Sequence, residues 1–187
     1  TPSRARRDGY PSGRLQVMTK AQYPQSYGDY LLLERLGVGG MSQVDLARKV
    51  TDEPDFLRFL VIKRIKADRT DDDAFVRMFK DEARITAELN HNNIAHVYDF
   101  GREGDEYYMA LEFVAGVDVR HVINVLRERK TRFPLRIALK ILCEVLVGLA
   151  YAHSKVDTLG RNMNIVHRDV NPRNIMISSR GEIKLID

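Results

Sequence analysis

Three side chains that could hold a metal ion or accept a proton lie near the end of the chain: Asp169, Asn174 and Asp187. The residues around them alternate between apolar runs and polar turns, which predicts short strands at residues 165–166, 175–177 and 182–187. Each of the three side chains therefore stands at the end of a strand. Burying a carboxylate is costly unless a partner compensates it, so the trio indicates a cation, a substrate or both. The alternative is a polar loop that only caps strand ends.

Two further charges stand in apolar surroundings upstream. Lys63 interrupts the apolar strand predicted at residues 59–65, and Glu82 lies on the apolar stripe of a helix predicted at residues 72–89. Each charge needs a partner, and pairing the two satisfies both. The alternatives are that Lys63 extends to the surface along its aliphatic stem and that Glu82 stands at the edge of the helix.

A glycine-rich turn at residues 37–42 joins two predicted strands, at residues 30–36 and 43–48. Glycines let backbone N–H groups approach phosphate oxygens, although many hairpins use glycine only for its left-handed backbone, so this turn alone is a weak signal. A dinucleotide-binding turn is excluded, because that motif opens a helix and the alternation of Val44 and Leu46 predicts a strand.

The ordered set of a glycine-rich turn, Lys63, Glu82, the run 167–169 (His-Arg-Asp), Asn174 and Asp187 resembles the eukaryotic-type (Hanks-type) protein kinases, and most of all the bacterial Ser/Thr kinases among them. The resemblance covers about residues 27–187. It implies an α+β, protein-kinase-like fold with a five-stranded antiparallel N-lobe sheet and one helix, followed by the first part of a mainly helical C-lobe. The expected divisions are a basic flexible leader, the N-lobe, and a hinge with a truncated C-lobe, at residues 1–26, 27–113 and 114–187.

The same resemblance implies a role for each site residue. The catalytic set is Asp169, which accepts or orients the proton of the substrate hydroxyl, with Lys63, Glu82 and Arg173, and magnesium is held by Asn174 and Asp187. Contacts to ATP are implied for Leu36, Gly37, Val38, Gly39, Gly40, Ser42, Val44, Val61, Lys63, Leu111, Glu112, Val114, Asp118 and Met176. Within this set, the backbone of Glu112 and Val114 is expected to bind adenine, and Leu111 to close the back of the pocket. Asp118 either contacts the ribose or only caps the helix that follows it.

The sequence departs from the family pattern at two positions. Ser42 occupies the place of the third glycine, where it either stiffens the turn or adds a hydroxyl toward the phosphates, and Asn171 occupies the place where Ser/Thr kinases usually carry Lys. Arg173 matches an Arg of Tyr kinases, whereas Pro172 is typical of Ser/Thr kinases. We expect transfer of the γ-phosphate of ATP to Ser/Thr hydroxyls of a protein substrate, with Tyr or dual specificity left open. A catalytically weak or inactive kinase-like protein that binds nucleotide or serves as a scaffold is the alternative, and a small-molecule kinase is a further one.

Composition narrows the remaining possibilities. The net charge of +4 resides in residues 1–26, and basic and acidic residues balance in the rest, so no nucleic-acid partner is expected. No apolar run is long enough for a membrane span, and the scattered His residues exclude a zinc site.

Cys143 is the one cysteine, is expected to be buried, and fits a cytoplasmic setting. It belongs to a long helix predicted at residues 134–154, whose inward-facing residues are expected to be Leu135, Ala138, Ile141, Leu142, Val145, Leu146 and Leu149.

Overall fold

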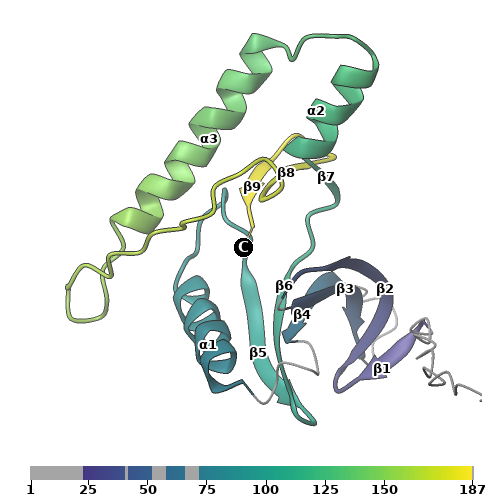
Figure 1. Ribbon diagram of the computed structural model, residues 1–187. Coiled ribbons are helices and arrows are strands. Elements are labelled where there is room, and N and C mark those ends of the chain that lie inside the picture. The colour runs from purple at the N-terminus through teal and green to yellow at the C-terminus, as the bar shows by residue number, and fades with distance from the viewer. Residues whose placement is uncertain (1–22, 41, 52–57, 66–71, 187) are drawn as a thin grey trace, which may run out of the picture.

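The computed structural model describes residues 23–40, 42–51, 58–65 and 72–186, which form two lobes (Figure 1). The first lobe consists of a six-stranded sheet with the helix α1 (Asp73–Ala87) beside it, and the second contains two helices and a three-stranded sheet. The expected α+β architecture with a sheet-rich N-lobe and a mainly helical second lobe is therefore present.

The sheet of the N-lobe is antiparallel throughout and runs in the order β1-β2-β3-β4-β6-β5. Its strands are β1 (Gln25–Tyr27), β2 (Tyr30–Val38), β3 (Ser42–Lys49), β4 (Phe59–Ile65), β5 (Val97–Glu103) and β6 (Glu106–Glu112). The predicted count of five strands was wrong, because β1 begins inside the segment that the sequence analysis assigned to the leader. This strand has only three residues, of which Tyr27 alone is buried, so it leaves no alternating pattern in the sequence. Residues 1–22 of the expected leader lie outside the described residues.

The pairing register of the sheet decides which side chains face the helix. Val44 of β3 is opposite Lys63 of β4, and Lys63 is opposite Met109 of β6, so these three side chains share one face. The residues that alternate with them build a core on the other face, made of Tyr27, Tyr30, Leu32, Ala47, Leu60, Ile62 and Ala110. Lys63 is thereby turned toward α1.

Helix α1 begins at a side-chain cap and packs on the same face of the sheet as Lys63. The carboxylate of Asp72 accepts from the backbone N–H of Ala74 at 3.0 Å, which satisfies one of the free donors of the first turn. Phe79 and Ala83 are buried against a cluster that includes Met109. Glu82 follows the buried Phe79 by three residues, so it lies on the side of α1 that packs on the sheet.

The outer face of the N-lobe sheet contains a fully buried carboxylate, Asp45, at 0% exposure. It accepts a hydrogen bond from the hydroxyl of Tyr23, one from Gln43 Nε2 at 2.9 Å and one from Arg64 Nε at 3.1 Å. A weaker ion pair joins it to Arg35 Nε at 3.6 Å. This network ties the segment before β1 to strands β2, β3 and β4.

Arg64 is the main cation of this network and is itself paired twice. Its Nη1 lies 3.0 Å from the carboxylate of Glu106, and its guanidinium lies over the ring of Tyr27, 5.1 Å from the centroid. Burial alone would lower the pKa of Arg64, but the carboxylates of Glu106 and Asp45 outweigh it and raise that pKa. The guanidinium therefore stays charged inside the sheet face.

The second lobe is built from β7 (Gly116–Asp118), α2 (Val119–Glu128), α3 (Leu135–His153), β8 (Ile175–Ser178) and β9 (Ile183–Leu185). Its strands pair antiparallel in the order β7-β8-β9, and its core is the cluster Val119, Ile141, Val145, Ile175, Ile183 and Leu185. The strand predicted at residues 165–166 was wrong: this segment forms no strand, and Val166 is 61% exposed. Two apolar residues without a neighbouring strand make too little contact to form one.

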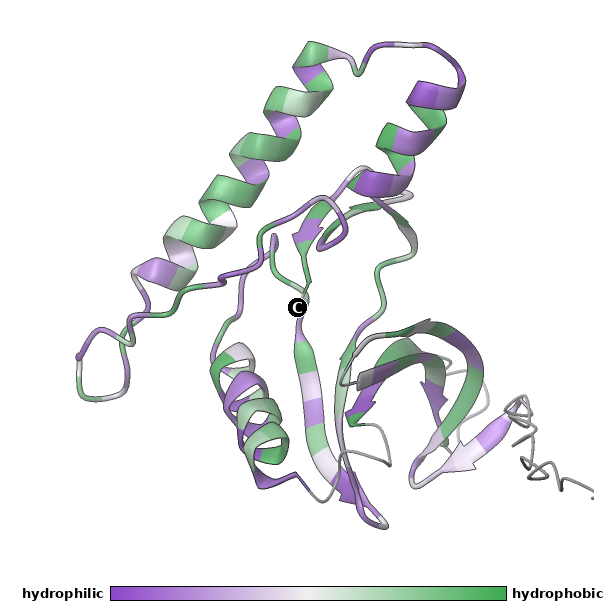
Figure 2. Cartoon of the chain, viewed as in Figure 1, coloured by the Kyte–Doolittle hydropathy of each residue, from purple (hydrophilic) through white to green (hydrophobic). Residues whose placement is uncertain are grey.

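Helix α3 is apolar on most of its surface rather than along one stripe, as its green colour in Figure 2 shows. Ile141, Val145, Gly148 and Ala152 are buried, whereas the predicted inward positions Leu135, Leu142 and Leu146 are exposed. Cys143 is exposed as well, so its predicted burial was wrong. The cause is that β9 and the loop around Asn93 contact one face of α3, and periodicity cannot single out that face when nearly every position is apolar.

Candidate functional site

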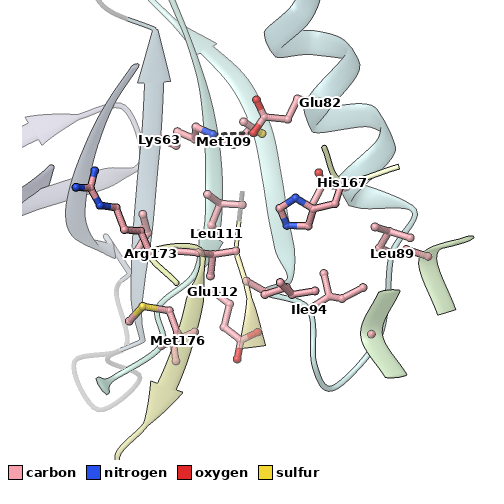
Figure 3. A pocket seen from close by; sticks show the side chains of 18 of the residues that line it. Lys63, Glu82, Leu89, Ile94, Met109, Leu111, Glu112, His167, Arg173 and Met176 are labelled. Carbon is pink, nitrogen blue, oxygen red and sulfur yellow. Dashed lines mark hydrogen bonds and ion pairs between the residues drawn. The ribbon is translucent and has the colours of Figure 1, made fainter. Parts of the chain in front are cut away.

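A cavity of about 840 Å³ is lined by residues from both lobes. The N-lobe contributes Leu36, Gly37, Val44, Val61, Lys63, Met109 and Leu111, and the second lobe contributes Met176, Leu185 and the segment 163–168. Figure 3 shows Leu111, Met109 and Met176 among the side chains around this space. A cavity of this volume with mostly apolar walls and a few charged groups at its edge is the usual form of a small-molecule site.

One ion pair lies at the inner end of the cavity, between Lys63 of β4 and Glu82 of α1. The Lys63 Nζ lies 2.7 Å from Glu82 Oε1, and both residues line the cavity (Figure 3). Lys63 is buried at 7% exposure, and the Glu82 side chain is 39% exposed. The predicted pairing is confirmed, and Lys63 does not extend to the surface. The pair fixes a buried ammonium in the wall of the cavity.

The connector between the lobes forms another wall. Leu111, Glu112 and Val114 all line the cavity, and the Glu112 N–H donates to the carbonyl of His96 at 2.8 Å. The Glu112 side chain turns away to Lys184 of β9, whose Nζ lies 3.0 Å from Oε1. This ion pair joins β6 of the N-lobe to β9 of the second lobe, next to the connector.

Asp118 lines the cavity and also caps α2. Its Oδ1 accepts from the His121 N–H at 2.7 Å, which is the capping function that the sequence left open. A contact of Asp118 with a ribose stays a prediction.

The glycine-rich turn forms the outer edge of the site. Gly39 N donates to the carbonyl of Ser42 at 2.8 Å, which closes the turn. Leu36, Gly37 and Val44 line the cavity on the two sides of this turn. The other predicted contacts, Val38, Gly39, Gly40 and Ser42, lie beyond the lining residues, so their contact with a ligand stays a prediction.

The loop after the segment 163–168 brings the remaining candidate side chains together. Arg168 has a φ of 65°, a left-handed conformation that is costly for a residue other than glycine and that is concentrated at functional sites. Next to it, the Asp169 carboxylate accepts from Asn174 Nδ2 at 2.9 Å, through Oδ2. Asp169 and Asn174 are thus in direct contact. Arg173 lines the cavity, whereas Asp169 and Asn174 lie just outside its lining, and Asp187 lies outside the described residues.

Two contributors to the site were not predicted as such. Met109 is 1% exposed and stands opposite Lys63 in the register, where it fills the floor of the cavity. Only the pairing of β4 with β6 identifies it, and no local pattern marks that register. The second is Asn171, which the sequence marks only as the position where Ser/Thr kinases usually carry Lys. In the structure its side chain donates to the Asp169 carboxylate at 2.9 Å.

Comparison with known proteins decides the family. The family model described as the protein kinase domain matches residues 30–187, which is most of the chain. This chain belongs to the protein kinase family. The fold, the Lys63–Glu82 pair and the loop around Asp169 all agree with that membership.

Several bacterial kinases are similar in sequence to this kinase domain. The tyrosine-protein kinase MasK of Myxococcus xanthus is 36% identical over 87% of the chain, and the Ser/Thr kinase PrkC of Bacillus subtilis is 35% identical over 86%. The Ser/Thr kinase PknB of Mycolicibacterium smegmatis is 36% identical over 88%. The chain spans about a quarter of the length of these relatives, with 25%, 22% and 24% of each covered.

A solved structure agrees with the fold. The kinase domain of PknI from Mycobacterium tuberculosis superposes with a TM-score of 0.69 at 27% identity, covering 90% of this chain and 62% of that one. Among the described residues of the present kinase domain, no helix is long and apolar enough to cross a membrane.

Proposed function

We propose that the whole protein is an ATP-dependent protein kinase that transfers the γ-phosphate of ATP to Ser and Thr hydroxyls of a protein substrate. The observation that carries the proposal is the 2.7 Å pair between Lys63 and Glu82 at the inner end of the cavity, in a chain of the protein kinase family. The proposed location is the cytoplasm, where ATP is available.

In this proposal each wall of the cavity has a task. The apolar side chains of Val44, Val61, Leu111 and Met176 hold the adenine ring, which forms hydrogen bonds with the connector backbone at Glu112, through its carbonyl, and at Val114. Lys63, held by Glu82, binds phosphate oxygens at the inner end.

Asp169 is the proposed catalytic base. Its carboxylate orients the substrate hydroxyl and takes its proton as the hydroxyl oxygen bonds to the γ-phosphorus. The bond from that phosphorus to the β–γ bridging oxygen breaks in the same step, and ADP leaves. Arg173, which lines the cavity, is the proposed cation near the transferred group.

Magnesium is the proposed metal, with Asn174 and Asp187 as its protein ligands. Asn174 uses Nδ2 to bind Asp169, at 2.9 Å from Oδ2, so its side-chain oxygen is the atom that remains to bind a cation. When bound, magnesium would neutralise charge on the phosphate oxygens.

Tyrosine specificity is a second candidate. Arg173 stands where Tyr kinases carry Arg, and one relative bears the name tyrosine-protein kinase. Pro172 and the two relatives named Ser/Thr kinases favour Ser/Thr.

The test is phosphoamino acid analysis of a generic protein substrate after incubation of the full-length protein with γ-labelled ATP and magnesium. We expect phosphoserine and phosphothreonine, and loss of the label when EDTA removes the metal. Phosphotyrosine alone would replace the Ser/Thr assignment by the tyrosine one. Absence of label would favour the weak or inactive alternative, and transfer that persists in EDTA would contradict the role of magnesium.

A further inference from the structure

The side chain of Asn171 forms a hydrogen-bonded clamp with Asn174 around the carboxylate of Asp169. Asn171 Nδ2 donates to Asp169 Oδ1 at 2.9 Å, and Asn174 Nδ2 donates to Oδ2 at 2.9 Å. Both amides also reach the backbone carbonyl of Asp169, at 3.2 Å and 3.0 Å. Each oxygen of the carboxylate therefore receives its own amide donor.

The other end of the Asn171 amide is held as well. Its Oδ1 accepts from the Arg173 N–H at 2.8 Å, and the Asn171 carbonyl accepts from the Asn174 N–H at 3.0 Å. Because a carboxamide is planar, fixing Oδ1 on the backbone also fixes the direction in which Nδ2 points. The turn from Asn171 to Asn174 thus aims the amide at Asp169.

This arrangement is needed because Asp169 is exposed. An exposed carboxylate samples several side-chain rotamers in water, and transfer requires the one that meets the substrate hydroxyl. Hydrogen bonds from two sides select one orientation. Asn171 carries no charge, so it holds the carboxylate without neutralising it.

We propose that Asn171 is a positioning residue for phosphoryl transfer, which holds the Asp169 carboxylate in its reactive orientation and does not itself contact the phosphates. The positive charge that a Lys at this position would supply is left to Arg173, which lines the cavity. The inference rests on the proposed function, because it gives Asn171 a task in that reaction.

The test uses two variants of the full-length protein that preserve the turn. In Asn171→Ser the hydroxyl can still accept from the Arg173 N–H, but it is too short to donate to the Asp169 carboxylate. In Asn171→Asp the acceptor is kept, and the donor facing Asp169 is replaced by a second carboxylate. We expect kcat to fall about tenfold in Asn171→Ser, which corresponds to one lost hydrogen bond to a charged group, and further in Asn171→Asp. KM for ATP should change less than about twofold in Asn171→Ser, because a positioning residue does not bind the nucleotide.

A matched control is available in the preceding loop. Asn162 Oδ1 accepts from the Asn164 N–H at 2.7 Å, which is the same type of turn without contact to Asp169. Asn162→Ser should leave kcat and KM unchanged, and all three variants should unfold within a few degrees of the wild type.

The outcomes separate the two proposals. If the wild type transfers no phosphate, the proposed function fails. If the wild type is active and Asn171→Ser has the same kcat, Asn171 does not position Asp169 and only this inference fails. A raised KM for ATP at unchanged kcat would also overturn it, because it would mean that Asn171 contacts the nucleotide.

Discussion

Replacing the buried carboxylate of Asp45 by an amide should destabilise the N-lobe strongly, although Asp45 is remote from the proposed chemistry. Asp45→Asn keeps the shape of the side chain and removes its charge. Hydrogen bonds to charged partners contribute about 1.5–3 kcal/mol each, and the bond from Arg64, whose side chain is 11% exposed, loses its charged acceptor. The loss of unfolding free energy stays below the roughly 3–5 kcal/mol that breaking a buried ion pair costs, because Arg64 keeps its ion pair with Glu106 at 3.0 Å.

The other partners add little to this loss. The Arg35 side chain is 36% exposed and 3.6 Å away, so its pair contributes at most about 1 kcal/mol. Gln43 and Tyr23 can each still bond to an amide. The expected loss is therefore roughly 2–4 kcal/mol. At about 2–4 °C per kcal/mol for a domain of this size, Tm should fall by roughly 4–16 °C.

Thermal unfolding followed by circular dichroism measures this loss, with an exposed ion pair as the control. Asp105 lies 2.8 Å from Arg102, but their side chains are 89% and 52% exposed, so Asp105→Asn should leave Tm unchanged. If Asp45→Asn unfolded within about 1 °C of the wild type, the network on the outer face would not be a source of stability, and the reasoning would be refuted.

Three further predictions follow from the same structure. Lys63→Met should lower turnover at least about 100-fold in a labelled-ATP assay while Tm stays within a few degrees, and wild-type turnover would remove Lys63 from the site. Burial raises the pKa of Tyr27 and of Tyr30 above the ordinary value near 10, so their contribution to stability is complete below pH 10 and is lost as pH rises beyond it. Tyr27→Phe should accordingly shift alkaline unfolding to higher pH, and an unchanged pH midpoint would contradict the raised pKa. Gly116→Ala would place a Cβ 1.9 Å from a backbone oxygen of β8, so it should cost about 1–3 kcal/mol in unfolding free energy; a neutral effect would show that β7 and β8 can separate without cost.

The parts of the site that the sequence predicted share one property: a charge interrupts an apolar pattern. Lys63 interrupts an apolar strand, and Glu82 lies on the apolar stripe of a helix. Each charge needs an opposite charge nearby, so their pairing could be predicted before the fold was known. The burial of Asp45 was not predicted. Its neighbours Val44 and Leu46 point to the opposite side of the strand, and their apolar alternation indicated that side as the buried one. Both faces of β3 are in fact covered, and the face with Asp45 and Ala47 is the more deeply buried one.

The remaining errors concern contacts that only the folded chain creates. Strand β1 forms because Tyr27 and Tyr30 pack against Tyr108, not because its three residues favour a strand. The clamp around Asp169 depends on the left-handed backbone at Arg168 and on a turn that ends at Asn174, and neither is visible in residue types alone. These contacts come from tertiary geometry, which local patterns do not encode.

The most direct test of the proposed chemistry is to remove the base and keep the binding site. In Asp169→Asn the carboxylate that would take the hydroxyl proton becomes an amide of the same shape, while the cavity walls and the Lys63–Glu82 pair are unchanged. Transfer of γ-phosphate to protein should fall by about 100-fold or more, and binding of a fluorescent ATP analogue should stay within about threefold of the wild type. Transfer at the wild-type rate with Asn at this position would contradict the assignment of Asp169 and the mechanism built on it.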